Sequence, residues 1–435
     1  MNCFVRGGRA LFVLGAAALP IVVESWVSLA RAGDWPTFRG PGRTAVSSDA
    51  GLLQAWPAEG PKLVWETQGG GRGYSSLAIA GHQIYTLGDG PSTAEDKDEY
   101  LLCFNRDSGA PLWKAKTGPA WNSGQSNWQG SRSTPTVDGD RVYVISPHGE
   151  LVCCDTSSGQ ERWRKSLKND FQGKKGDNWG YSESPLVDGD LLVCTPGGET
   201  TTMVALNKLT GEVVWKVARK EDRGAGHSSI VVSNISGTKI YVQLTANGPL
   251  GVRASDGQIL WTFPMNKVTA VIPTPIVRDN LVFYAVGYGT GGGTLIRQIA
   301  GQNGAVTIEQ VNPLNSALVN KHGGTVLVGD YVYGDTDDGG IPHCAELMTG
   351  KKMWQKRGSG KGSTSIISAD GCLYLHYADG TMALAKADPT DYVETGSFKV
   401  PGSGERPSWS HPVIVDGRLY LREQDKLLCY DIRAN

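Results

Sequence analysis

Eight positions of the sequence combine residue types that could form a binding site. Each lies three positions before a proline, or its equivalent, in a repeated phrase. They are Tyr74, Arg132, Ser182, His227, Ile272, His322, Ser363 and Trp409, with His411 two residues beyond the last. Imidazole and guanidinium groups beside aromatic faces could bind an anionic, planar or sugar-like ligand. The alternative is that these residues hydrogen-bond loops at the rim of a channel.

Two aromatic inserts precede two of these positions. Residues 121–128 begin and end with tryptophan, and Asp177-Asn-Trp179-Gly-Tyr181 follows the same pattern of aromatic and amide groups. Such groups resemble carbohydrate or peptide contact chemistry, although they could equally be packed plugs. Glu183 is a candidate acid, but one carboxylate makes no acid–base mechanism. The candidate ligand-binding set is Tyr74, Arg132, Trp179, Tyr181, Glu183, His227, His322, Trp409 and His411, and no catalytic residue is assigned.

Motifs for metals, phosphate and nucleophilic catalysis are weak. The stretch Asp335–Glu346 resembles a calcium loop, but its fifth position is glycine and the repeat makes it a hairpin. Gly287–Gly293 is glycine-rich without a helix after it, which argues against a phosphate loop. The chain has no His-Glu-x-x-His or paired Cys-x-x-Cys zinc motif and no Gly-x-Ser-x-Gly before a helix. We therefore predict no metal site.

The candidate residues would be positioned by a repeat of about 48 residues. An 11-residue phrase recurs in which a glycine stands four positions before a tryptophan. The pairs are Gly109/Trp113, Gly159/Trp163, Gly211/Trp215, Gly257/Trp261 and Gly350/Trp354. A sixth copy is degenerate, with Gly304 and Ile308 in these places. A tryptophan is large enough to fill the wedge between neighbouring repeats, so these tryptophans and Trp65 are predicted to be structural.

A second phrase, clearest at Ser133–Tyr143, precedes each copy and occurs eight times in all. It reads as a short strand, an Asp-Gly turn and a second strand, and the tryptophan phrase supplies two more strands. Four antiparallel strands per repeat are typical of a β-propeller blade. The sequence therefore predicts an all-β, eight-bladed propeller with four-stranded antiparallel blades; an open β-solenoid is the alternative.

The two ends of the chain also predict how the ring closes. The eighth copy has a third strand at Leu427–Asp431 but no fourth before Asn435. Pro61-Lys-Leu-Val-Trp65 is a spare strand ending in tryptophan. We expect this N-terminal strand (Pro61–Trp65) to complete the last blade, which would remove the open sheet edges.

The cysteines look like core residues. Seven of the eight lie after residue 32, and an odd number leaves at least one unpaired. Cys103, Cys153, Cys344 and Cys429 occupy one place in the third strand, where another copy has Ala205. A free cysteine behaves as a small hydrophobe. A disulfide between Cys153 and Cys154 is disfavoured because adjacent strand residues point to opposite faces.

The N-terminus reads as a targeting signal. Arg6 and Arg9 precede the apolar stretch Ala10–Val23, and Ala30-Arg31-Ala32 fits a cleavage site. We expect a cleaved signal peptide over 1–32, an N-terminal extension over 33–60 and the propeller over 61–435, with the protein periplasmic or secreted. A retained membrane anchor is the alternative, and no cysteine suited to lipid attachment follows the apolar run.

Composition narrows the function classes. The 42 Lys and Arg balance 43 Asp and Glu, which argues against a general nucleic-acid binder. Glycine, with 58 residues, is nearly twice its usual share, as many tight turns between short strands require. The expected molecule is a monomer with no nucleic-acid partner and no transmembrane segment after signal cleavage.

The Gly-x-x-x-Trp phrases, together with Asp34-Trp-Pro-x-x-Arg39, Trp179–Pro185 and Ile272-Pro-Thr-Pro275, resemble the tryptophan-docking repeat of pyrroloquinoline-quinone (PQQ)-like propellers over about residues 61–433. That superfamily includes quinoprotein alcohol dehydrogenases and BamB. The resemblance implies PQQ held by Ca²⁺, a catalytic Asp and a vicinal disulfide loop in its dehydrogenases, and none of these can be placed on this sequence residue by residue. The closest likeness is to uncharacterised secreted bacterial members.

A fold of this kind hosts many functions. The interpretation favoured by the sequence is a binding or scaffold module of the cell envelope, not an enzyme, with envelope proteins or glycans as partners and no cofactor. The alternative is a PQQ-dependent alcohol or sugar dehydrogenase with Ca²⁺. The sequence does not name the ligand.

Overall fold

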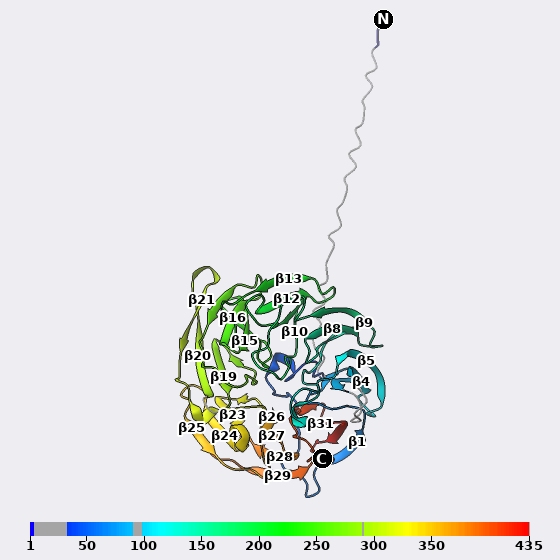
Figure 1. Cartoon of the computed structure of the whole chain (residues 1–435), viewed down its shortest axis with the longest axis vertical. Helices are drawn as coiled ribbons and strands as arrows, with labels where there is room; N and C mark the ends of the chain where they lie inside the picture. The colour runs from blue at the N-terminus through cyan, green and yellow to red at the C-terminus, as the bar shows by residue number, and fades with distance from the viewer. Residues whose placement is uncertain (4–32, 90–97, 289–290, 435) are drawn as a thin grey trace.

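The computed structural model describes residues 1–3, 33–89, 98–288 and 291–434. These residues form eight four-stranded antiparallel sheets arranged as blades around a central axis (Figure 1). No α-helix occurs in the described ranges. The helical turns found there are short 3-10 segments: η1 (Pro41–Arg43), η2 (Ser126–Trp128), η3 (Gln302–Gly304), η4 (Ser316–Leu318) and η5 (Asp337–Gly339). The predicted eight-bladed all-β propeller is confirmed.

The first four blades follow one another along the chain, each from an inner first strand to an outer fourth strand. Blade 1 contains β2 (Ala78–Ala80), β3 (Gln83–Asp89), β4 (Asp98–Asn105) and β5 (Pro111–Pro119). Blade 2 contains β6 (Thr136–Asp138), β7 (Arg141–Ile145), β8 (Glu150–Asp155) and β9 (Glu161–Ser166). Blade 3 contains β10 (Leu186–Asp188), β11 (Leu191–Cys194), β12 (Met203–Asn207) and β13 (Val213–Val217). Blade 4 contains β14 (Val231–Ile235), β15 (Thr238–Thr245), β16 (Gly248–Arg253) and β17 (Ile259–Thr262).

The second half repeats this arrangement. Blade 5 contains β18 (Ile276–Arg278), β19 (Leu281–Val286), β20 (Gly292–Ala300) and β21 (Val306–Gln310). Blade 6 contains β22 (Val326–Val328), β23 (Tyr331–Asp335), β24 (Pro342–Glu346) and β25 (Lys352–Gln355). Blade 7 contains β26 (Thr364–Ala369), β27 (Cys372–Tyr377), β28 (Thr381–Lys386) and β29 (Glu394–Lys399). Blade 8 contains β30 (Val413–Val415), β31 (Arg418–Glu423), β32 (Lys426–Asp431) and, as its outer strand, β1 (Lys62–Thr67).

Blade 8 closes the ring with the two ends of the chain. Strand β1 pairs antiparallel with β32, with Lys62 opposite Asp431 and Thr67 opposite Leu427. The strand begins one residue after the predicted start at Pro61, which has no N–H to donate to a ladder. Closure by the N-terminal strand is confirmed, and it leaves no unpaired edge at the seam.

Local chemistry within a blade explains the repeated phrase. In blade 2, Gly139 has a φ of +59° in the turn between β6 and β7, a conformation that glycine adopts without strain. Asp155 ends β8, and its carboxylate accepts hydrogen bonds from the N–H groups of Ser157 at 2.9 Å and Ser158 at 3.2 Å. The side chain thus closes the turn into β9.

The recurring tryptophans hold neighbouring blades together. The indole N–H of Trp163 in blade 2 donates to the carbonyl of Lys208 in blade 3 at 3.1 Å, and its ring covers Gly211, where a Cβ would lie 3.0 Å from the ring. The motif glycine of one blade therefore receives the tryptophan of the blade before it. The other indole donors bond as Trp65 to Arg106, Trp113 to Thr156, Trp215 to Ala254, Trp261 to the Gln298 side chain, and Trp354 to Asp388.

The degenerate copy leaves a different interface between blades 5 and 6. Ile308, the residue predicted at the tryptophan place, pairs with Gln298 and packs with the blade 4–5 cluster instead of facing blade 6. At the blade 5–6 interface, Asn312 donates to the carbonyl of Leu347 at 3.3 Å. That carbonyl lies three residues before Gly350. In the same way, the acceptor carbonyls of Arg106, Thr156, Lys208 and Ala254 lie three residues before Gly109, Gly159, Gly211 and Gly257. A cavity of about 320 Å³ lined by Asn312 and Gly350 remains at this interface. The amide thus replaces the indole donor but not its volume.

The segment before β1 crosses the centre of the ring, where the blue ribbon lies in Figure 1. Trp35 pairs with Ile79 of blade 1, Ser47 bonds to Ser368 of blade 7, and Leu53 bonds to Ile432 after blade 8. Between these points Arg39 and Arg43 are buried. The predicted extension over 33–60 is therefore anchored in the propeller by buried side chains such as Trp35, Arg39 and Arg43, although many of its other residues are exposed. No pattern in the sequence indicated this packing.

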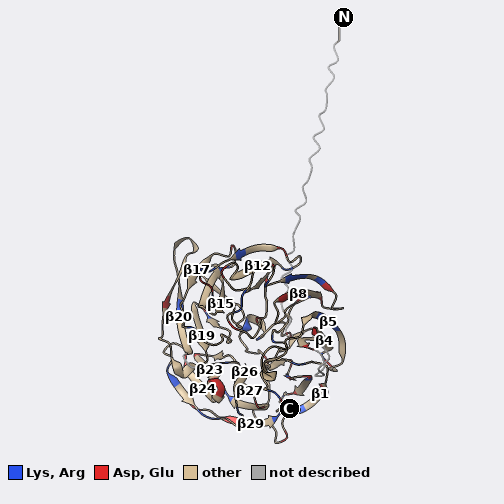
Figure 2. Ribbon diagram, viewed as in Figure 1, with Lys and Arg blue, Asp and Glu red and all other residues tan. Residues whose placement is uncertain are grey.

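Cysteines and charges also fit the predicted globular ring. All seven cysteines after residue 32 are buried and unbonded, including Cys153 and Cys154 within β8. Charged positions of both signs are spread around the ring instead of forming one patch of a single sign (Figure 2).

Within the described residues, no helix has the length and apolar character needed to cross a membrane. The predicted signal peptide falls almost wholly outside those residues.

Candidate functional site

The ring of residues that begin the blades surrounds a cavity of about 500 Å³, within the usual range of ligand pockets. Rotational repetition brings these distant positions to one mouth of the channel, because each inner strand starts at the same end. The ring positions on the cavity wall are Tyr74, Arg132, Ser182, His227, Ile272, His322 and Trp409, together with His411. Ser363 lies behind them and bonds to His322.

The buried extension forms part of this pocket. Phe38 and Arg39 line the cavity, and the Phe38 ring meets His411 edge-on at 4.9 Å. Arg39 donates through Nε to the carbonyl of Arg43 at 3.2 Å and through Nη2 to that of Thr325, while its Nη1 is buried without a hydrogen-bond partner. In the sequence, Arg39 stands in one of the phrases that carry the family resemblance. No motif indicated that it reaches the pocket.

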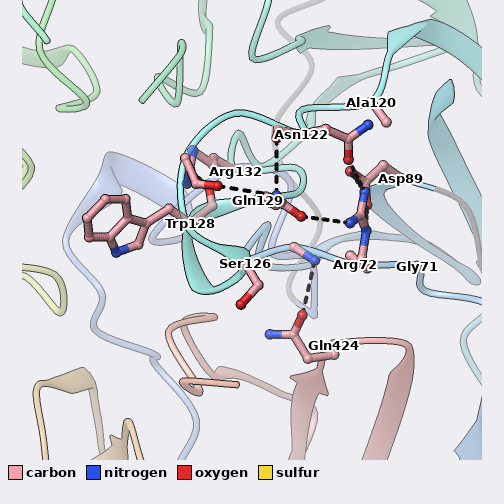
Figure 3. A network of polar contacts seen from close by, with 12 residues as sticks. Gly71, Arg72, Asp89, Ala120, Asn122, Ser126, Trp128, Gln129, Arg132 and Gln424 are labelled. Atoms are coloured by element: carbon pink, nitrogen blue, oxygen red, sulfur yellow. Dashed lines mark hydrogen bonds and ion pairs between the residues drawn. The ribbon is translucent and has the colours of Figure 1, made fainter. Parts of the chain in front are cut away.

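One wall is the insert between blades 1 and 2. Arg72 pairs with Asp89 at 2.9 Å and also donates to Asn122 at 2.6 Å and Gln129 at 3.1 Å (Figure 3). Arg406 bonds to the carbonyls of Ser126 and Gln129 from the blade 8 side. These contacts hold the insert across the mouth.

The insert places one tryptophan in the pocket and buries the other. Trp128 lines the cavity and meets Trp179 edge-on with ring centroids 5.7 Å apart. Trp121 is buried against His148 at 5.0 Å. The alternatives of contact residue and packed plug therefore each hold for one tryptophan of this insert.

A second wall of the pocket is a stack of rings. His322 lies parallel to Trp409 at 4.1 Å, and Tyr74 lies against the same indole at 4.8 Å. The hydroxyl of Tyr74 donates to the carbonyl of Asn127, which joins the two walls. Flat apolar faces on both sides favour a flat or ring-shaped ligand group.

A Ser–His–Asp set lies at the third side of the pocket. His227 Nδ1 is 2.6 Å from Ser182 Oγ, and His227 Nε2 is 2.9 Å from Asp177 Oδ2. The N–H of Trp179 donates to the other oxygen of Asp177 at 3.1 Å. His227 and Ser182 were predicted at the channel mouth from their places in the repeat. The set itself was not predicted, because Asp177, Ser182 and His227 do not form a recognisable motif along the chain.

The pocket carries a positive charge. Arg132 lines it and bonds through Nε to the carbonyl of Trp179 at 2.9 Å and through Nη2 to that of Trp128. Burial lowers the pKa of Arg132 to about 10, so it stays protonated at neutral pH. Lys321 also lines the cavity and pairs with Asp338 at 2.6 Å. With Arg39, the cations outnumber the carboxylates.

The pocket histidines are neutral. Burial, reinforced by nearby Lys175 and only partly opposed by Asp177, lowers the pKa of His227 to about 4. Burial, with neighbouring cations, lowers the pKa of His322 and of His411 to about 3. Around neutral pH each imidazole therefore has one N–H donor and one acceptor nitrogen.

Two predicted residues lie outside the pocket. Tyr181 is fully buried and donates to the carbonyl of Pro196 at 2.8 Å. Glu183 is buried behind the ring, where Thr195 N–H donates to it at 2.8 Å and Gln243 at 3.2 Å. These residues lie in the segment that leads into β10, where Ser182 and Ser184 line the cavity and their neighbours Tyr181 and Glu183 do not.

The donor set does not fit the calcium-held quinone that the family resemblance implies. Among the described residues that line the cavity, the one with a carboxylate is Asp338, and it already forms an ion pair with Lys321. Nowhere in the described ranges do three His, Cys, Asp or Glu side chains gather as a metal site requires. Asp335 bonds to Asn320 and to the N–H of Thr364, as a hairpin residue. Residues 289 and 290 of the Gly287–Gly293 stretch lie outside the described residues.

An eight-bladed ring with tryptophans docked on the glycines of neighbouring blades defines the class of PQQ-like repeat β-propellers. Residues 97–356 match the model of the family described as outer membrane protein assembly factor BamB. Since this match spans more than half of the chain, the protein belongs to that family.

Relatives and solved structures agree with this assignment. BamB of Moranella endobia is 26% identical over 258 residues (56% of this chain and 62% of the relative), and BamB of Shewanella oneidensis is 23% identical over 244 residues (52% and 57%). The chain thus spans about three-fifths of their length. BamB of Moraxella catarrhalis has a TM-score of 0.56 at 14% identity, covering 86% of this chain and 98% of that one. Quinohemoprotein alcohol dehydrogenase of Comamonas testosteroni has a TM-score of 0.61 at 12% identity, covering 94% of this chain and 82% of that one. Both structures show the shared fold.

The buried His411 predicts a pH-dependent stability. Its pKa of about 3 lies below the ordinary 6.5, so between these values the unfolded chain binds a proton that the folded protein does not. The stability contributed by neutral His411 is therefore lost as pH falls. We expect the destabilisation caused by His411→Gln to shrink by about 2 kcal/mol between pH 7 and pH 4.5, since each pKa unit corresponds to about 1.4 kcal/mol.

Urea unfolding at several pH values measures this difference. The control is His82→Gln, because the His82 side chain is 86% exposed. A constant difference between wild type and His411→Gln over this pH range would show that folding does not shift the pKa of His411.

Proposed function

We propose that this protein is a binding or scaffold module of the cell envelope that takes a segment of a partner protein at the channel mouth. The observation that carries the proposal is the 500 Å³ pocket with aromatic walls and an excess of cations. Such a pocket suits a segment with an acidic side chain beside an aromatic one.

The envelope location rests on two supports. The sequence predicts a cleaved signal peptide over 1–32, and the relatives are named outer membrane protein assembly factors. A propeller that presents one pocket at one end also suits a scaffold, because its outer strands remain available for other contacts.

Selection from a displayed library of random peptides about 12 residues long tests the proposal. We expect enrichment of peptides that combine Asp or Glu with Trp, Tyr or Phe, and weaker binding at high salt. Trp409→Ala removes the central indole of the stacked wall, and Lys321→Gln removes one cation. Each is expected to weaken a selected peptide at least about tenfold, or about 1.4 kcal/mol.

Matched controls keep the test specific. Lys352→Gln removes an exposed lysine from β25 on the outer edge of blade 6, and we expect unchanged binding. Selected peptides whose binding is equal in all four proteins would contradict binding at the mouth. No enriched peptide, together with saturable binding of an acidic oligosaccharide, would replace the protein partner by a glycan.

A further inference from the structure

Three side chains at the pocket form a chain of hydrogen bonds that binding alone does not require. Ser182 Oγ, His227 and Asp177 are joined at 2.6 Å and 2.9 Å. The side chains of His227 and Asp177 are only 6% and 5% exposed. Ser182 and His227 nevertheless line the cavity. A ligand in the pocket therefore reaches the serine while the carboxylate stays protected from water.

The carboxylate decides which nitrogen of His227 carries the proton. Burial acts to raise the pKa of Asp177, but the hydrogen bonds from His227 and from the N–H of Trp179, with the charge of Lys175, hold it well below the ordinary range. An ionised Asp177 can only accept, so Nε2 must carry the N–H. Neutral His227 then has its lone pair at Nδ1, and the Ser182 hydroxyl donates to it.

We propose that Ser182, His227 and Asp177 form a hydrolytic triad that cleaves aryl carboxylic esters bound in the channel mouth. Ser182 is the nucleophile, His227 the general base and acid, and Asp177 the positioning residue. Compared with the usual serine hydrolase arrangement, the two imidazole nitrogens exchange partners. The activity goes beyond the binding function proposed above.

The reaction balances with water as the only co-reactant. Ser182 Oγ bonds to the ester carbonyl carbon as its proton moves to His227 Nδ1. The carbon–oxygen bond to the phenol breaks, and the leaving oxygen takes that proton. Water then attacks the acyl-serine, gives a proton to Nδ1, and Ser182 Oγ leaves and recovers it. The products are one acid and one phenol.

Neighbouring groups support the chemistry of the acyl intermediate. Arg132 lines the cavity, and its bonds through Nε and Nη2 hold the guanidinium at the pocket wall. A fixed cation there stabilises the negative charge that develops on the carbonyl oxygen. Lys175 donates to the carbonyl of Gly226, directly before His227. Trp128 and Trp179 offer the aromatic surface for an aryl group.

The same ring contains a second Ser–His pair with which the first can be compared. His322 Nδ1 lies 3.1 Å from Ser363 Oγ, so a second Ser–His pair spans blades 6 and 7. Its imidazole stacks on Trp409, and no carboxylate contact of His322 is found among the described residues. Ser363 also lies outside the cavity lining. Only the first pair therefore has both an orienting carboxylate and access to a ligand.

Labelling of the purified full-length chain with a fluorophosphonate probe tests the triad, with the modified peptide identified by mass spectrometry. We expect one adduct on Ser182, and p-nitrophenyl butyrate hydrolysis above the buffer rate. Ser182→Ala should abolish both, and His227→Gln should slow labelling at least about a hundredfold. Ser363→Ala is the matched control and should change neither.

The Asp177→Asn variant tests whether Asp177 orients His227 for catalysis or only stabilises the fold. An asparagine can donate to Nε2 and so favours the other tautomer, which leaves no lone pair for Ser182. We expect kcat to fall at least about tenfold with KM and the melting temperature unchanged. Absence of an adduct on Ser182 in folded wild-type protein overturns the proposal, as does labelling at the same rate in His227→Gln. Adducts on Ser182 and Ser363 at equal rates overturn it too.

Discussion

Arg43→Ala is expected to lower the free energy of unfolding by about 3–5 kcal/mol, because each buried carbonyl that loses its donor costs about 1–3 kcal/mol and the lost side chain leaves a cavity. Arg43 is 4% exposed, and its guanidinium donates to the carbonyls of Ser184 at 2.9 Å, Ile230 at 3.0 Å and Pro185. Alanine leaves these acceptors of blades 3 and 4 buried and unpaired, and it leaves a cavity.

Urea unfolding measures the loss, and Arg433→Ala is the control. The Arg433 side chain is 59% exposed and pairs with Asp431 at the surface, so its removal should cost less than about 1 kcal/mol. Arg43→Lys should recover only part of the loss, because one ammonium does not reproduce the planar donor set. A loss below about 1 kcal/mol for Arg43→Ala would show that the extension is not anchored by this side chain.

The anchoring has a functional consequence. Arg43 belongs to the same segment as Phe38 and Arg39, which line the pocket. Releasing the segment would remove the pocket floor, so peptide binding should weaken in Arg43→Ala even though Arg43 does not line the cavity.

Trp215→Ala is expected to cost about 3–5 kcal/mol, as large-to-small substitutions of buried aromatic residues do. Trp215 is 8% exposed, donates to the carbonyl of Ala254 at 3.0 Å and stacks on Tyr241 at 6.2 Å. The substitution removes the contact between blades 3 and 4. Chemical denaturation gives the loss, and Leu112→Ala, at a residue 49% exposed in the outer strand of blade 1, should cost little.

Alanine substitutions at two glycines of blade 4 separate the contact of the Trp215 ring with Gly257 from backbone strain. Gly257 has a φ of +76°, and a Cβ there would lie 2.6 Å from the Trp215 ring; Gly237 has a φ of +85° with nothing within 4 Å. Alanine at either position costs about 1–2 kcal/mol of backbone strain. Gly257→Ala should cost about 1–3 kcal/mol more, because the ring must move. Equal losses for the two variants would mean that the tryptophan does not press on the motif glycine.

Much of the fold was predictable because the sequence signals for one blade recur in most of the repeats. The Gly-x-x-x-Trp spacing, the Asp-Gly turns and the spare strand at Pro61–Trp65 predict the blades and their closure from local and repeated signals. Residues of the cavity wall could also be predicted, because equivalent positions of the repeats lie at the same end of the channel. Arg132, His227, His322 and Trp409 occupy such positions.

The sequence left the structure open, or pointed away from it, where one residue must be placed against a distant one. Trp121 and Trp128 stand in the same insert, yet one is buried and the other lines the pocket. Tyr181 and Glu183 flank Ser182 and point away from the cavity. The direction of a side chain in an irregular segment depends on contacts such as those of Arg72 and Arg406, which sequence spacing does not reveal.

The sequence by itself determined the ring: its blade number, its closing strand, its docking tryptophans and the residues that begin each blade. The tertiary structure alone decided that Arg39 and Arg43 are buried in the channel, that a cavity remains beside Gly350 between blades 5 and 6, and that Asp177 orients His227 toward Ser182. The physical reason is that a repeat encodes contacts between equivalent places. The site instead depends on single side chains whose burial and hydrogen bonds arise only when separate blades meet.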